Sequence, residues 1–387
     1  MMKKICVVTS TRAEYGLLRP LINEINKDKN IELQLVVTGM HLSKEFGYTY
    51  KEIEEDGYKI DEKIDILSNS DDSIAISEAM SKTILEFSKC YTRLKPDIIV
   101  LLGDRYEIFS VASAASVLRI PIAHINGGET TEGAFDEAFR HSITKMSYLH
   151  FTSTEEYRKR VIQLGECPDR VFNVGALGVE NIKNIDLLSK TELEKGLNFL
   201  FDKNVALVTF HPVTLENSTA VEQFYELLRA IDEVDDLKII FTKANCDTDG
   251  MKINKLIDNY VEHNKDKAIA FTSMGILKYL SAMKYCSFVL GNSSSGIAET
   301  PSFKIPTINI GDRQKGRIQA LSVINCVPIK EDILNSINIA LSLEFNNKLY
   351  DISNPYEGIN TSENITHIIK EFLVNNKIDL KKKFYDL

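Results

Sequence analysis

The chain alternates short runs of apolar, often β-branched residues with longer segments whose apolar positions recur at helical spacing. Short apolar runs predict buried strands, and the segments between them predict amphipathic helices. The strand candidates of the first half are residues 5–9, 33–37, 98–102, 120–125, 150–152 and 171–174. Those of the second half are residues 205–210, 237–242, 268–271, 287–290 and 307–310. This alternation predicts an α/β fold with parallel sheets that helices cover on both faces.

The alternation restarts after residue 178, where Ser189-Lys-Thr-Glu192 has the spacing of a helix capping box. We therefore expect two doubly wound, Rossmann-like domains, at residues 1–178 and 179–361. A length of 387 residues is enough for two such cores. Residues 362–387 are expected to hold a helix that packs back on the first domain, and Lys381-Lys-Lys383 is expected to be a solvated basic end.

Composition and charge argue against several classes of partner. The net charge of −9 disfavours nucleic acid, which needs a basic face. The six cysteines show no CxxC spacing, so we expect reduced thiols in a cytoplasmic protein and neither a disulfide framework nor a zinc site. The N-terminal apolar run is too short for a signal peptide, and no apolar stretch has the length of a membrane span.

Polar residues follow most of the strand candidates, at the places where open α/β sheets bind ligands. These segments are Thr11-Arg-Ala-Glu-Tyr15, Val37-Thr-Gly-Met-His41, Gly103-Asp-Arg105, Asn126-Gly-Gly-Glu129 and Phe210-His-Pro-Val-Thr214. Charged residues after strands also cap helices, so each segment has a purely structural alternative. The chain lacks both the Rossmann dinucleotide fingerprint and the P-loop pattern, which argues against NAD or ATP chemistry.

Gly291-Asn-Ser-Ser-Ser-Gly296 lies between a strand candidate and a helical segment. Small residues at such a turn let backbone amides and hydroxyls converge on an anion, although Ser and Gly are also ordinary turn residues. Gly311-Asp-Arg313 follows the next apolar run and adds a permanent guanidinium charge. Together the two segments predict a diphosphate site.

In this order, the motifs at residues 11–15, 37–41, 103–105, 210–214, 291–296 and 311–317 resemble those of the hydrolysing UDP-N-acetylglucosamine 2-epimerases, most of all the bacterial sialic-acid-pathway type. The resemblance spans nearly the whole chain. It implies the two-domain fold shared with GT-B glycosyltransferases, with the substrate in the cleft between the domains. It also implies conversion of UDP-GlcNAc and water into ManNAc and UDP by a cytoplasmic homodimer or homotetramer that needs no metal and no cofactor.

That activity implies elimination of the diphosphate to 2-acetamidoglucal and then rehydration, which needs at least two acid/base groups. The resemblance places Asp104, Asp136 and His211 at catalytic positions. Each has a structural alternative. Asp104 would pair with Arg105, Asp136 would form a helix-face ion pair with Arg140 four residues later, and His211 would bond nearby backbone.

One position departs from the family pattern. Many members have a glutamate before the paired glycines, where this chain has Asn126, and asparagine cannot exchange a proton as a carboxylate does. We hypothesise that Glu129, the nearest carboxylate of the same loop, supplies the missing acid/base function. Asn126 would then make a neutral hydrogen bond to the substrate.

The resemblance also implies contacts to the nucleotide. Ser293, Ser294 and Gly296 are expected at the diphosphate. Glu299 is expected at the ribose, because a carboxylate can accept hydrogen bonds from two neighbouring hydroxyls. Further contacts to the phosphates, the uridine or the sugar are expected from Arg12, Arg105, Asn245 and Arg313.

Other substrates and activities stay open. A 4-acetamido-6-deoxy sugar differs from GlcNAc only near C4 and C6, so a UDP- or GDP-linked N,N'-diacetylbacillosamine, as in the legionaminic acid pathway, is an alternative substrate. A glycosyltransferase of the same fold would use the same nucleotide half, and a non-hydrolysing epimerase would release UDP-ManNAc. A non-catalytic nucleotide-sugar sensor would not need so many acid/base residues.

Overall fold

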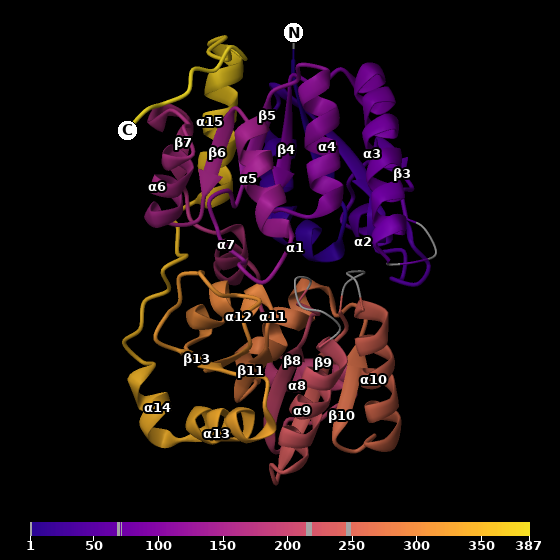
Figure 1. The fold of residues 1–387 in the computed structure, drawn as a ribbon, viewed down its shortest axis with the longest axis vertical. Coiled ribbons are helices and arrows are strands. Elements are labelled where there is room, and N and C mark those ends of the chain that lie inside the picture. Colours follow the sequence, from indigo (N-terminus) through magenta and orange to yellow (C-terminus); the bar gives the residue numbers. More distant parts are fainter. Residues whose placement is uncertain (1, 68–69, 71, 214–218, 245–248) are drawn as a thin grey trace. The chain divides into compact units, whose positions relative to one another are not determined.

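The computed structural model describes residues 2–67, 70, 72–213, 219–244 and 249–387. Contacts divide the chain into two compact units. Unit 1 comprises Met1–Glu129, Asp136–Asn181 and Tyr356–Leu387, and unit 2 comprises Thr130–Phe135 and Ile182–Pro355. Each unit holds one parallel sheet flanked by helices (Figure 1), which confirms the predicted α/β class. The place of Thr130–Phe135 in the second unit was not expected from the sequence.

Unit 1 is built on a seven-stranded sheet in the order β3-β2-β1-β4-β5-β6-β7. The strands are β1 (Lys3–Thr9), β2 (Ile31–Thr38), β3 (Glu62–Ile64), β4 (Ile98–Leu102), β5 (Ile122–Ile125), β6 (Leu149–Thr152) and β7 (Val171–Asn173). Every neighbouring pair is parallel. The central strand β4 is buried at each of its positions, as expected for a parallel strand with both faces covered.

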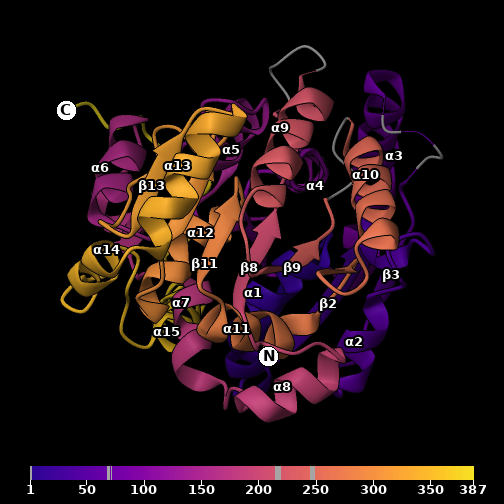
Figure 2. The same ribbon diagram turned by 90° about the horizontal axis from the view of Figure 1, so that it is seen from below.

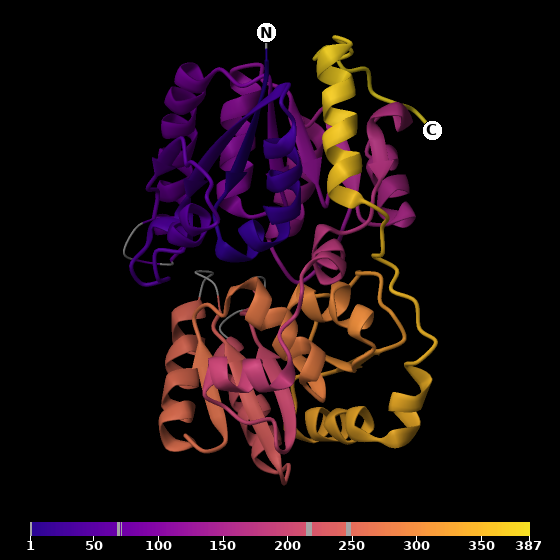
Figure 3. The same cartoon turned by 180° about the vertical axis from the view of Figure 1, so that it is seen from behind.

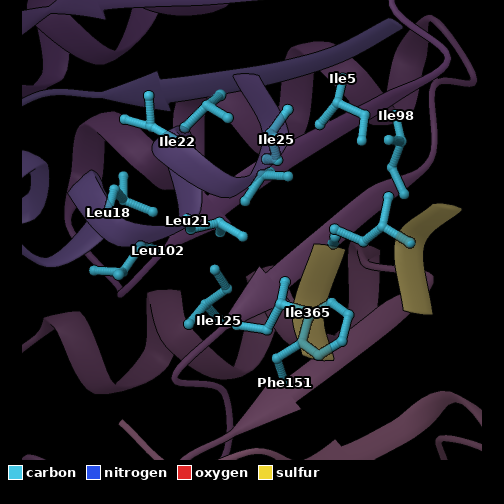
Figure 4. Close-up of a cluster of buried hydrophobic side chains, with 14 of the residues drawn as sticks. Ile5, Leu18, Leu21, Ile22, Ile25, Ile98, Leu102, Ile125, Phe151 and Ile365 are labelled. Atoms are coloured by element: carbon cyan, nitrogen blue, oxygen red, sulfur yellow. The ribbon is translucent and has the colours of Figure 1, made fainter. Parts of the chain in front are cut away.

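Helices cover both faces of this sheet. The helices of unit 1 are α1 (Arg12–Lys27), α2 (Tyr50–Glu55), α3 (Ser73–Leu94), α4 (Tyr106–Val117), α5 (Asp136–Met146), α6 (Glu155–Gln163) and α15 (Thr361–Val374). A further helix, α7 (Leu177–Asn184), crosses from unit 1 into unit 2. On one face, α1 and α15 lie side by side (Figure 3), and Leu18 and Ile365 join the same buried cluster as Ile98 and Phe151 (Figure 4). On the other face, α3 and α4 contribute most of the helical residues of a second buried cluster.

Unit 2 repeats the plan with a six-stranded parallel sheet in the order β10-β9-β8-β11-β12-β13. Its strands are β8 (Asn204–Thr209), β9 (Leu237–Thr242), β10 (Ala268–Phe271), β11 (Phe288–Gly291), β12 (Thr307–Ile310) and β13 (Val323–Cys326). Its helices include α8 (Lys190–Leu197), α9 (Ala220–Asp232), α10 (Gly250–His263), α11 (Gly275–Tyr285), α12 (Ser294–Ala298), α13 (Lys330–Leu341) and α14 (Leu343–Lys348). Figure 2 shows α9 and α13 on one side of the strands and α8 and α11 on the other, and a buried cluster fills each side.

The strand predictions hold for the buried strands and fail at two edges. All eleven predicted runs overlap observed strands. The sequence prediction missed β3 and β13, which lie at the ends of their sheets. β3 has only three residues and reads Glu-Lys-Ile, and β13 is only partly buried, so neither carries the continuous apolar run of a central strand. The predicted capping box at Ser189 and Glu192 is confirmed, with both reciprocal hydrogen bonds present.

A buried carboxylate anchors the C-terminal segment of unit 1. Glu166 accepts hydrogen bonds from Lys145 (2.6 Å), His150 (3.1 Å) and Lys382 (2.9 Å). Burial alone would raise the pKa of Glu166, but these three donors lower it to about 2. The expectation of a solvated basic end at residues 381–383 is therefore wrong for Lys382, whose ammonium also donates to two backbone carbonyls. Within the described residues, no helix is long and apolar enough to cross a membrane.

Candidate functional site

Three carboxyl-edge segments of unit 1 meet around one buried guanidinium. Arg140 of α5 forms an ion pair with Asp104, which follows β4. It also donates to the Glu137 carboxylate (2.6 Å) and to the backbone carbonyl of Glu129 (2.9 Å), which follows β5. The Arg140 side chain is 1% exposed, whereas that of Asp104 is 22% exposed. Arg140 thus brings Asp104 and the Glu129 loop together, and the side of Asp104 that solvent reaches is available to a ligand.

Asp104 pairs with Arg140 rather than with Arg105, while along α5 Glu137 pairs with both Arg140 (2.6 Å) and His141 (3.1 Å). Arg140 is buried and reaches across to Asp104, while Arg105 at the start of α4 pairs with Glu107 through two 3.2 Å contacts. Sequence spacing gives the partners along one helix but says nothing of residues on a neighbouring loop.

The loop after β5 has a backbone that explains its residue types. Asn126 has φ of 66°, a left-handed conformation that asparagine adopts more readily than glutamate. Gly128 also has positive φ, and a Cβ there would lie 2.5 Å from the Tyr157 carbonyl oxygen. Glu129 is buried and accepts a 2.8 Å hydrogen bond from the Ser153 hydroxyl. Asp136 begins α5 and is half-buried, so the loop and the helix place both predicted acid/base residues in unit 1.

Another buried carboxylate of unit 1 lies near the carboxyl end of β1. It was not among the site residues predicted from the sequence. Glu14, in the first turn of α1, accepts hydrogen bonds from the Ser10 backbone amide (2.7 Å) and hydroxyl (3.0 Å). Burial raises its pKa to about 7, although the Ser10 bonds and the nearby Arg105 charge oppose this rise. Arg12, a predicted nucleotide contact, is the first residue of the same helix. Glu14 therefore holds the turn that presents Arg12.

Two buried histidines near this edge are neutral and structural. The His41 ring lies 3.1 Å from the Thr9 hydroxyl and 2.9 Å from that of Thr49. His124 lies 2.8 Å from the Gly103 carbonyl oxygen. Burial lowers the pKa of each histidine to about 3. Neither ring gains a proton near neutral pH, so both serve as hydrogen-bond links between strand ends.

In unit 2, the glycine- and serine-rich segment forms a tight turn after β11. Gly291 has φ of 134°, and a Cβ there would lie 1.9 Å from the Thr209 carbonyl oxygen, so only glycine fits. Ser293 caps the short helix α12, and Ser294 is its first residue. Gly296 packs against Thr307 of β12. The segment therefore packs closely against its neighbouring strands, which leaves little room for larger side chains at residues 291 and 296.

Glu299 ends this segment as a buried carboxylate. It accepts a hydrogen bond from the Ser295 hydroxyl, which in turn accepts one from the Tyr279 hydroxyl (2.8 Å). Burial raises the pKa of Glu299, and the Ser295 bond opposes that rise. A carboxylate in this setting is oriented by its neighbours and suits the binding of hydroxyl groups.

His211 and Arg313 meet through one asparagine. The backbone of His211, which follows β8, exchanges two 2.7 Å hydrogen bonds with the side chain of Asn292. Arg313, in the loop after β12, donates to the Asn292 carbonyl (3.2 Å). The structural alternative for His211 was a bond between its ring and nearby backbone. The bonds seen here are made by the His211 main chain, so the role of the ring stays a prediction.

The loop of Arg313 also packs on Thr130–Phe135. The Glu132 amide donates to the Lys315 carbonyl (3.3 Å), and a Cβ on Gly133 would lie 3.2 Å from the Arg313 Cα. Thr130–Phe135 is therefore held within unit 2 by the loop after β12.

The predicted contact Asn245 lies outside the described residues. Among the residues that the structure does describe, no group of three or more His, Cys, Asp or Glu side chains is arranged to hold a metal ion.

Comparisons with known proteins agree with these features. A family model described as UDP-N-acetylglucosamine 2-epimerase matches residues 23–370. The chain is 50% identical, over 84% of each chain, to a Campylobacter jejuni protein named GDP/UDP-N,N'-diacetylbacillosamine 2-epimerase (hydrolyzing). It is 43% identical to the Escherichia coli polysialic acid biosynthesis protein P7, over 100% of this chain and 98% of that one. The fold matches a Staphylococcus aureus MnaA–UDP structure with a TM-score of 0.80 at 21% identity, over the whole of both chains.

We expect Glu14→Gln to remove a pH-dependent loss of stability from unit 1. Because the folded-state pKa is raised from 4.5 to about 7, the folded chain binds more protons than the unfolded chain between these values. The free energy of unfolding should therefore fall as pH rises from about 4.5 to about 7, by on the order of 3 kcal/mol. Glutamine cannot ionise, so the variant should lose this slope.

The measurement is urea unfolding of both proteins across that pH window, with the difference between them as the readout. The buried histidines have lowered pKa values and act in the opposite direction, but they are common to both proteins and cancel. Glu45→Gln, at an exposed position, controls for the loss of one negative charge. An identical slope in the wild type and Glu14→Gln would contradict the prediction.

Proposed function

We propose a substrate and a division of catalytic roles for this chain, which belongs to the UDP-N-acetylglucosamine 2-epimerase family and is a hydrolysing nucleotide-sugar 2-epimerase. The proposed substrate is a nucleotide-linked N,N'-diacetylbacillosamine. The observation that carries this choice is the 50% identity to the Campylobacter jejuni protein named for that substrate. This substrate replaces UDP-GlcNAc, which was the first candidate from the sequence.

UDP-GlcNAc is the second candidate. The family model carries its name, and the Escherichia coli relative, 43% identical over the whole chain, is named for polysialic acid biosynthesis. The two sugars share the acetamido group at C2, and they differ at C4 and C6. Both substrates therefore need the same chemistry at C1 and C2.

The amide nitrogen at C2 decides the route. A transient ketone cannot form at a carbon that bears an acetamido group, so the proton at C2 must leave by elimination. The bond from C1 to the diphosphate oxygen breaks while a base takes the C2 proton, which gives a 2-acetamidoglucal. Water then adds at C1, and a proton returns to C2 on the opposite face. The sum is substrate plus water to the free 2-epimer plus nucleoside diphosphate.

We assign the proton transfers to carboxylates of unit 1. Asp104 is partly exposed and oriented by Arg140, which suits a base that must reach a sugar. Glu129 and Asp136 flank the loop of Thr130–Phe135 and are the further acid/base candidates. Glu129 supplies the group that the family pattern has at the position of Asn126.

We assign the nucleotide and the leaving group to unit 2. Ser293, Ser294 and Gly296 offer hydroxyls and backbone amides to the diphosphate, and Arg313 offers positive charge. His211 protonates or contacts the departing diphosphate, and Glu299 binds the ribose hydroxyls. Further contacts are proposed for Arg12, Arg105 and Asn245.

The substrate assignment is tested by turnover in heavy water. UDP-GlcNAc, UDP-N,N'-diacetylbacillosamine and GDP-N,N'-diacetylbacillosamine are each incubated with the enzyme in D2O, and products are identified by mass and by proton NMR. We expect the highest kcat/KM with a diacetylbacillosamine nucleotide and release of the free sugar with one deuterium at C2. A preference for UDP-GlcNAc would favour the second candidate. A released sugar without deuterium at C2 would exclude the elimination route.

Replacement of Glu129 by glutamine tests its acid/base role. The variant keeps the acceptor for Ser153 but cannot transfer a proton, so kcat should fall by roughly 100- to 10,000-fold. Asn126→Ala removes only a neutral hydrogen bond and should cost far less. Initial rates of nucleoside diphosphate release give both numbers, and near-normal turnover by Glu129→Gln would refute the hypothesis.

Glu299→Ala separates a ribose contact from a structural helix-end carboxylate. Loss of a ribose contact removes binding that substrate and transition state share, so KM should rise more than kcat falls. Glu331→Ala removes an exposed first-turn carboxylate of α13 in the same unit and should change neither constant. An unchanged KM in Glu299→Ala would contradict the ribose assignment.

A further inference from the structure

The side chain of Asn292 is fully buried at the meeting point of three loops of unit 2. It follows β11, whose last residue, Gly291, pairs with Thr209 of the parallel strand β8. Its Nδ2 donates to the His211 carbonyl and its Oδ1 accepts from the His211 amide, both at 2.7 Å. This reciprocal pair fixes the backbone of His211 as a strand ladder would, at the point where β8 has already ended.

The main chain of Asn292 holds the loop after β12. Its carbonyl oxygen accepts hydrogen bonds from Arg313 (3.2 Å) and from the Gln314 side-chain amide (2.9 Å). Gln314 is fully buried, and its side-chain nitrogen holds the carbonyl of Asn292. One residue therefore connects the segment of His211 to the segment of Arg313.

We propose that Asn292 is a positioning residue for the reaction, because it sets the place of His211 relative to Arg313. The proposal rests on the roles assigned above to those two residues at the leaving diphosphate. A proton donor and a charge-stabilising guanidinium act on the same group only if both are held within reach of it. Asn292 sets the position of His211 relative to Arg313 through its hydrogen bonds and does not itself contact the substrate.

A carboxamide meets the requirement at this position without needing to be protonated. The His211 backbone presents one donor and one acceptor side by side, and the side chain of Asn292 presents the complementary pair. Alanine would leave both backbone groups buried and unpaired, which favours a shift of the loop toward other partners. A displacement of about 1 Å at a catalytic group costs on the order of 100-fold in rate.

The test compares Asn292→Ala with His211→Gln and with the double variant, using the substrate that the panel above identifies. We expect kcat of Asn292→Ala to fall on the order of 100-fold. KM should change less, because Arg313 contacts the main-chain carbonyl of residue 292, which alanine keeps. Because Asn292 acts on kcat through His211, adding Asn292→Ala to His211→Gln should lower kcat little further. Asn309→Ala, at another buried asparagine of the neighbouring strand β12, is the matched control and should leave kcat and KM unchanged.

A second variant keeps the proposal testable if the melting temperature of Asn292→Ala is too low for kinetic measurements. Asn292→Asp has nearly the same shape, and only its protonated carboxyl offers both a donor and an acceptor to His211. Its kcat relative to wild type should therefore rise as pH falls from 8 to 6. His211 and Arg313 are the charged or titratable residues in contact with position 292, and taking the ratio to wild type at each pH removes the titrations that the two proteins share.

The outcomes separate this inference from the proposed function. Independent, multiplicative losses in the double variant, or a flat Asn292→Asp ratio, would overturn the positioning role while leaving His211 in place. Normal turnover by His211→Gln would overturn the assignment of His211 itself, and the inference with it. Coupled losses together with an acid-restored Asn292→Asp support both.

Discussion

Parallel pairing of the strands is the constraint on which the rest of this structure depends. Every neighbouring pair in both sheets is parallel, so all strands of a sheet end at the same edge. Helices must return the chain to the opposite edge, which buries both faces of the sheet and keeps the strands apolar. Most of the predicted site residues of each unit lie in or beside the loops at that edge. The packing that stabilises the sheets thereby leaves these residues outside the apolar strands.

The loops at that edge are held by buried polar side chains, since too few backbone partners remain once the strands end. Arg140 ties Asp104 to the Glu129 loop in unit 1, and Asn292 ties His211 to the loop of Arg313 in unit 2. Both residues are almost completely buried, so each is satisfied by several partners at once. The predicted site residues are thus oriented by neighbours that a substrate need never contact.

Burial also decides which groups can carry protons. It keeps His41 and His124 neutral, so these rings link strand ends and do not shuttle protons. It raises the pKa of Glu14 to about 7, so ionisation of this carboxylate lowers the stability of the turn after β1. In unit 1, Asp104 stays partly exposed beside the buried Arg140, so solvent or a ligand can reach it.

The sequence by itself determined the α/β class, eleven of the strands and the segments that carry the candidate site, because apolar periodicity and small-residue turns are local properties. It could not reveal β3 and β13, since edge strands need no continuous apolar run. Only the tertiary structure decided that Arg140 pairs with Asp104, that Lys382 is anchored on Glu166 and that Asn292 joins two loops. Each of these contacts joins residues far apart in the chain. Their partners are set by which strands lie side by side, and no local pattern encodes that order.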